Sequence, residues 1–140
     1  MTSSFKTFTV SITAAALMAA ATVSAAPPAS LGNTVWNLQI NREVVQLVIT
    51  SQSGPGAPGA ATCRIINGEL GVASIRGHYC PSTGRIHFVH RNADNQNAVR
   101  VFTGNLADDV PGQVRYMGGT VTVLDAAFGD LGEYPFFATN

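Results

Sequence analysis

"RIHFVHRNADNQNAVRVFTGNL", residues 85–106, carries the clearest signal for the fold class of this chain. In the segment 85–90, Ile86, Phe88 and His90 share one face if the chain is extended, whereas Arg85, His87 and Val89 share the other. This period of two is typical of a β-strand with one buried face, because successive side chains of a strand point to opposite faces. The polar run that follows Arg91 predicts a loop, and residues 98–106 predict a second strand.

The same pattern of short strands and turns continues in both directions from this stretch. The predicted strands are residues 35–40, 44–50, 62–66, 69–79, 85–90, 98–106, 113–124 and 134–139. Asn41-Arg42, Asn67-Gly68 and residues 81–84 predict turns, and Asn-Gly is the strongest short hairpin signal. No segment keeps a period of 3.6 long enough for a helix beyond a short turn near 125–132.

This spacing of strands predicts an all-β fold, an eight-stranded antiparallel up-and-down barrel, with a β-sandwich as the alternative. Two pairs of glycines, Gly71 with Gly77 and Gly118 with Gly119, fall inside predicted strands. Glycines at such positions indicate bulges or sharp bends, which a small barrel needs in order to close.

The N-terminal part predicts export of the chain. Residues 1–25 have one positive charge, Lys6, then a short apolar run and small residues at 23–25, as a signal peptide does. We expect residues 26–34 to be a flexible lead-in and residues 35–140 to form a single β-barrel domain. The apolar run is too short for a membrane span, so we expect no span in the mature chain.

The composition indicates the compartment of the protein and the kinds of partner that we expect. The 115 residues that follow the predicted signal hold seven arginines and eight carboxylates, a net charge of −1, and no lysine. The arginines are scattered, which argues against nucleic acid as a partner. Cys63 and Cys80 predict one disulfide, and the chain has no N-glycosylation sequon, so we expect a periplasmic or extracellular location in a bacterial setting.

The order of elements resembles the calycin superfamily, which includes lipocalins and avidins. The resemblance is carried by "GNTVW", residues 32–36, which opens the first strand, and by an arginine in the penultimate strand, "GQVRYMGGTVTV", residues 112–123. In that superfamily the tryptophan closes the barrel floor and packs against a basic residue of a late strand. The resemblance implies these roles for Trp36 and Arg115, and it covers most of residues 32–139.

His87 and His90 are three residues apart, and we do not expect them to bind one metal ion together. The two side chains diverge on a strand, because ligands on one strand reach one ion only at a spacing of two. His90 ends the face that holds Ile86 and Phe88, so we expect it near a barrel mouth, where it contacts a ligand or is a hydrogen-bonded rim residue. His87 is expected in solvent, and His78 beside the disulfide.

The sequence contains no nucleophile, metalloprotease or phosphate-binding motif, so we expect no enzymatic activity, no metal and no cofactor. We predict a secreted binding protein that holds a small apolar or amphipathic molecule in the barrel mouth. The predicted ligand-binding residues are Trp36, Phe88, His90, Phe102 and Tyr116. The alternative is a protein-interaction module, such as an exported hydrolase inhibitor, in which the lead-in or the 51–61 loop enters the target.

Overall fold

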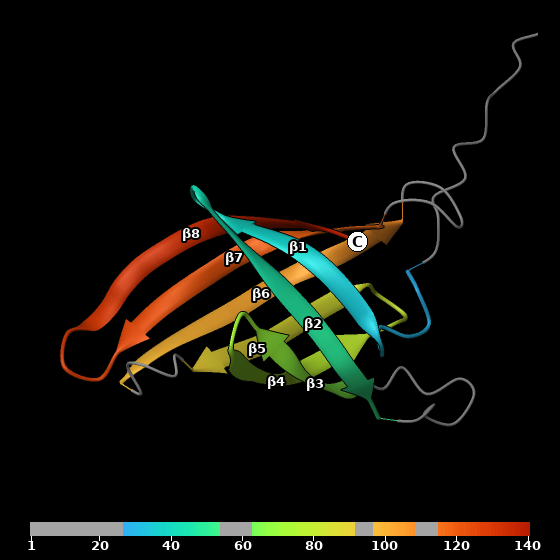
Figure 1. Cartoon of the computed structure of the whole chain (residues 1–140), viewed down its shortest axis with the longest axis horizontal. Helices are drawn as coiled ribbons and strands as arrows, with labels where there is room; N and C mark the ends of the chain where they lie inside the picture. The colour runs from blue at the N-terminus through green and yellow to red at the C-terminus, as the bar shows by residue number, and fades with distance from the viewer. Residues whose placement is uncertain (1–26, 54–62, 92–96, 109–114) are drawn as a thin grey trace, which may run out of the picture.

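Eight antiparallel strands close into a barrel in the computed structural model, which describes residues 27–53, 63–91, 97–108 and 115–140 (Figure 1). The predicted fold class is thereby confirmed, and the sandwich alternative is wrong. The strands are β1 (Thr34–Ile40), β2 (Glu43–Gln52), β3 (Arg64–Leu70), β4 (Ala73–Cys80), β5 (Arg85–Arg91), β6 (Ala98–Asp108), β7 (Arg115–Asp125) and β8 (Gly129–Thr139).

Each strand pairs with the next one along the chain, and β8 pairs with β1 to close the barrel. The closing seam is short, since it joins four residues of β1, Asn37–Ile40, to four residues of β8, Phe136–Thr139. The turns 41–42, 71–72 and 126–128 lie at one end of the barrel, toward the left in Figure 1, which we call the mouth end. The segment 27–33 lies at the opposite end, which we call the lead-in end.

The interior below the mouth is filled by side chains. Alternate residues of every strand point inward, and the largest fully buried ones are aromatic or aliphatic. Phe88 and Phe102 stack with ring centroids 4.4 Å apart, and Phe102 meets Phe136 edge-on at 5.4 Å. This agrees with the geometry of eight strands, whose interior is just wide enough for side chains or one small ligand.

The predicted hairpin at Asn67-Gly68 is wrong, because both residues lie inside β3. The turn between β3 and β4 is at residues 71–72, where Gly71 has a φ of +63°. This register directs Ile66 and Leu70 inward, where both are buried. Gly68 is required for another reason, since a Cβ there would collide with the carbonyl oxygen of Val48 on the neighbouring strand.

The last strand begins five residues earlier than predicted, at Gly129 rather than residue 134. Asp125 ends β7, and its Oδ1 accepts hydrogen bonds from the backbone N–H groups of Ala127 at 2.8 Å and Phe128 at 3.2 Å. Such a side-chain cap forms a tight turn without a helix. Residues 125–133 therefore form a short turn followed by strand.

The segment that precedes β1 makes specific contacts with the barrel. Leu31 is fully buried, and its N–H donates to Gln52 Oε1 at 2.8 Å. The phenol of Tyr79, also fully buried, donates to the carbonyl oxygen of Pro28 at 2.6 Å. Residues 27–33, predicted as a flexible lead-in, thus cover one end of the core.

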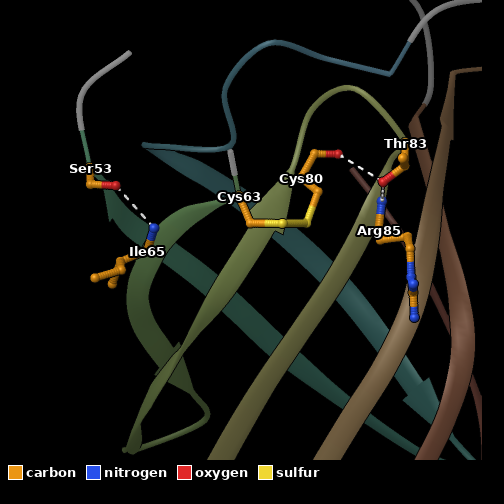
Figure 2. Close-up of a disulfide and its surroundings, with 6 residues drawn as sticks. All are labelled: Ser53, Cys63, Ile65, Cys80, Thr83 and Arg85. Carbon is orange, nitrogen blue, oxygen red and sulfur yellow. Dashed lines mark hydrogen bonds between the residues drawn. A yellow bond between two sulfur atoms is a disulfide. The ribbon is translucent and has the colours of Figure 1, made fainter. Parts of the chain in front are cut away.

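The predicted disulfide is present. Cys63, which directly precedes β3, is joined to Cys80, the last residue of β4, with Cα atoms 4.0 Å apart (Figure 2). Nearby, Thr83 Oγ1 accepts a hydrogen bond from the Arg85 N–H at 3.4 Å (Figure 2). A structural disulfide is characteristic of an oxidising, non-cytoplasmic compartment.

The predicted signal peptide, residues 1–25, and most of the loop 51–61 lie outside the described residues. Within the described ranges, no helix has the length and apolar character needed to cross a membrane.

Candidate functional site at the barrel mouth

A cavity of about 340 Å³ opens at the mouth end. Its apolar wall comes from strands at the two sides of the closing seam, namely Ile40 of β1, Val121 and Val123 of β7, and Tyr134 of β8. The charged side chains of Arg42, Glu43 and Arg100, together with Asn41, line the rest. The volume falls at the lower end of the range for small-molecule sites, about 300–1,000 Å³.

Strand alternation explains why these residues converge. Val121 and Val123 share the inward face of β7 with buried Met117, and Tyr134 shares the inward face of β8 with buried Phe136. The Tyr134 hydroxyl donates to the carbonyl oxygen of Leu131 at 3.1 Å, which fixes the ring beside the cavity. The core ends at this level, so the inward positions near the strand ends border an open space.

A second cavity of about 190 Å³ adjoins the first and shares Glu43 and Arg100 with it. Its other lining residues come from β2, from the hairpin of β3 and β4, and from β5; they are Val45, Leu70, Gly71, Val72, Ala73 and His90. The two hollows together therefore place two guanidinium groups, one carboxylate and one imidazole around an apolar mouth.

His90 is the most unusual polar group of this region. Its side chain is 6% exposed, and its Nδ1 atom is buried without a hydrogen-bond partner. Burial lowers the pKa of His90, and the charge of Arg100 lowers it further, while the backbone of Leu70 and the charge of Glu43 act in the opposite direction. A neutral imidazole with an unsatisfied ring nitrogen is a group that gains from a ligand hydrogen bond.

The structure separates the five predicted ligand-binding residues into three groups. His90 lines a mouth cavity. Phe88 and Phe102 are fully buried one inward position deeper than His90 and Arg100, and Trp36 is fully buried near the start of β1, toward the lead-in end. Tyr116 lies on the outer face, where its ring stacks on that of Phe137 with centroids 5.8 Å apart.

The mouth residues that sequence reasoning missed are Arg100, Glu43 and Tyr134. The signal for two of them was present, because Arg100 is two residues from Phe102 and Tyr134 is two residues from Phe136. A charged or polar side chain that follows a core aromatic by two positions on the same face indicates where the filled core gives way to the barrel mouth. Glu43 begins a strand that has apolar residues on both faces, so the sequence does not indicate whether Glu43 points inward or outward.

The roles implied for Trp36 and Arg115 concern the lead-in end. The Trp36 indole donates to Thr34 Oγ1 at 2.8 Å, and the Thr34 hydroxyl donates to the carbonyl oxygen of Leu31 at 2.6 Å. Arg115 begins β7 at this same end, and its carbonyl oxygen accepts from the Asn140 N–H at 3.1 Å. Trp36 therefore helps to close the lead-in end, beneath the segment 27–33.

Two further hollows lie on the outer face of the barrel. One, of about 390 Å³, is a groove on β4 and β5 whose exposed or half-buried lining includes Arg76, Val89 and Arg91. It is larger than the mouth cavity, but its lining comes from two neighbouring strands only, so we regard it as a surface groove. The other, of about 220 Å³, lies beside the disulfide and is lined in part by His78 and His87.

Among the described residues, no group of three or more His, Cys, Asp or Glu side chains is arranged to hold a metal ion. Comparisons of this chain with protein-family models, curated protein sequences and solved structures gave no match.

Proposed function

We propose that this protein is a calycin-like, non-enzymatic binding protein that holds a small amphipathic molecule at its mouth end. The observation that carries the proposal is the meeting of an apolar wall with Arg100 and with the unpartnered Nδ1 of His90. The apolar part of the ligand would contact Val121, Val123 and Tyr134. Its polar or anionic part would face the guanidinium and the imidazole, because buried charges and polar atoms need partners.

We also propose that the chain is exported, to the periplasm or the extracellular space. The disulfide between Cys63 and Cys80 supports this, since such bonds persist in oxidising compartments. The apolar run before residue 26 is the second reason, because a secretory signal peptide contains such a run.

The test uses 8-anilinonaphthalene-1-sulfonate, a fluorescent amphipathic anion, as the probe. The oxidised protein is expected to enhance its fluorescence saturably, while near-ultraviolet circular dichroism shows native packing, because partly folded proteins also bind this dye. Arg100→Gln is expected to weaken binding about tenfold or more, since a charge-assisted hydrogen bond contributes about 1.5–3 kcal/mol. Val123→Asp, which places a like charge in the cavity, is expected to abolish binding.

The matched control is Arg76→Gln, which removes a cation from the outer groove instead of the mouth. Binding should change less than twofold in this variant. Failure of the native protein to bind the probe would contradict the proposal. Loss of binding in Arg76→Gln with no loss in Arg100→Gln would move the site to the outer groove and would contradict it equally.

A second candidate function is docking of a protein partner at the same end. Val72 and Phe128, in the turns 71–72 and 126–128, are 91% and 81% exposed, and the core below the mouth is filled by side chains. Exposed apolar side chains that gather at one end are typical of interaction sites. This candidate predicts that Phe128→Asp abolishes capture of a partner and leaves binding of the fluorescent anion unchanged.

A further inference from the structure

His78 and His87 face each other directly across the ladder between β4 and β5. Their rings lie nearly parallel, with centroids 5.0 Å apart and an interplanar angle of 21°. The partner of His87 is thus a residue nine positions earlier in the chain, and not the nearby His90. Side chains at directly opposite positions of an antiparallel pair have Cβ atoms about 4.5–5.5 Å apart, close enough to act together.

Both imidazoles point to the outer face of the barrel. Tyr79 and Ile86, their chain neighbours, are buried in the core, so alternation places His78 and His87 outside. His78 is exposed and His87 is half-buried, so water and ions reach the pair. The hollow of about 220 Å³ that contains them is otherwise lined by Cys63, Cys80, Arg85, Ile86 and Thr103.

The backbones of β4 and β5 are held close together beside this pair. A Cβ at Gly77, which precedes His78, would collide with the carbonyl oxygen of His87 and lie 2.5 Å from the Phe88 Cα. Only glycine permits this approach, and it fixes the relative position of the two strands that carry the imidazoles. The neighbouring disulfide holds the end of β4 against residue 63.

We propose that His78 and His87 form a binding site for a divalent transition-metal ion, with Cu²⁺ preferred over Ni²⁺ and Zn²⁺. Imidazole nitrogens bind these ions at about 2.0–2.1 Å, and rotation of the two rings about their side-chain bonds would direct one nitrogen of each toward a common ion. Water completes the coordination, because the cysteine sulfurs are joined to each other. The preference for Cu²⁺ follows the general order of affinity of nitrogen ligands for these metals.

One further observation supports the pair as ligands. Burial and the neighbouring His78 lower the pKa of His87, which favours the neutral imidazole that a metal needs. The positive charge of Arg85 opposes binding, but its exposed side chain lies in solvent, where charge effects are screened. The site is on the outer face and shares no lining residue with the mouth cavities, so it is independent of the proposed ligand.

The test is a titration of the oxidised, tag-free protein with Cu²⁺, followed by proton NMR of the three histidine rings. The paramagnetic ion should broaden the ring resonances of His78 and His87 at substoichiometric amounts, before and more strongly than those of His90, which lies three residues from His87 on the opposite face of β5. Zn²⁺ titration by calorimetry should give one ion per chain. His78→Asn and His87→Asn should each weaken Cu²⁺ binding about tenfold or more, and His90→Asn should leave it unchanged.

The wild-type NMR experiment does not depend on the folding of any variant. Absence of Cu²⁺ binding would overturn the proposal. Equal broadening of all three histidines, or unchanged affinity in both His78→Asn and His87→Asn, would place the ion elsewhere and overturn it as well.

Discussion

His90 of β5 lies directly opposite Arg100 of β6, and both side chains line the smaller mouth cavity. A histidine that is buried beside a permanent cation resists protonation, because the charged imidazolium would lose water and meet a like charge. The pair therefore keeps one neutral hydrogen-bonding group and one positive charge together at the mouth.

The first prediction concerns stability against pH. Because the pKa of His90 is lowered in the folded state, the unfolded chain binds the proton more tightly. The contribution of this group to stability is complete above the unfolded pKa, near 6.5, and is lost as pH falls from there toward the folded pKa. His87, whose pKa is also lowered, acts in the same direction. Urea unfolding at pH 8 and pH 5.5 should show a loss of stability at the lower pH.

His90→Gln is the variant that isolates the effect of this one group. It should lose less stability between the two pH values than the wild-type protein does. An equal loss in both proteins would mean that His90 does not contribute to the pH dependence.

The second prediction concerns the aromatic stack in the core. Phe102 is fully buried between Phe88 and Phe136, so Phe102→Ala should lower the free energy of unfolding by about 3–5 kcal/mol. Phe128→Ala, in an exposed turn, should change it by less than about 0.5 kcal/mol. Chemical denaturation of both variants checks the difference, and similar values for the two would contradict the described packing.

The third prediction concerns the attachment of the segment 27–33. Tyr79→Phe removes the buried hydrogen bond to the Pro28 carbonyl and should cost about 1–3 kcal/mol. The N-terminal segment should also become more accessible to proteases and to hydrogen exchange. Tyr116→Phe, on the outer face, is the control and should show neither effect. If Tyr79→Phe leaves protease cleavage before residue 34 unchanged, this bond does not hold the segment.

The fourth prediction concerns the disulfide, which links residues 17 positions apart. The double variant Cys63→Ser with Cys80→Ser should lose about 3 kcal/mol of stability, as expected from the entropy of closing a loop of this size in the unfolded chain. Thermal and urea unfolding measure the loss. A double variant that is as stable as the oxidised protein would show that the hairpin β3–β4 alone restrains this end.

Strand alternation predicted the fold, and the inward face of β5 that holds Ile86, Phe88 and His90, from the sequence. It failed where glycines interrupt the pattern, because a residue without a side chain does not mark a face. Gly118 and Gly119 do not indicate which face of β7 is buried, so the outward orientation of Tyr116 was not predicted. Gly68 led to the prediction of a turn, although it lies inside β3 and permits a close contact with β2. The mouth residues Glu43 and Arg100 come from separate hairpins, and only the closed barrel brings them together.

The contact between His78 and His87 is a second feature that the sequence alone does not predict. Their contact depends on the register between β4 and β5, which the turn at residues 81–84 sets. A shift of register by one residue would separate the rings, so the sequence spacing of the two histidines does not predict their contact.

The seam between β1 and β8 has a consequence for how the protein is made. β1 can pair with β8 only when Phe136–Thr139 is available, and this segment follows β1 by about a hundred residues. Until then, a hairpin of β1 and β2 has a free edge with no strand to pair with. A partly folded chain therefore exposes an unpaired edge of β1 until residues 136–139 dock, and such an edge can pair with another chain.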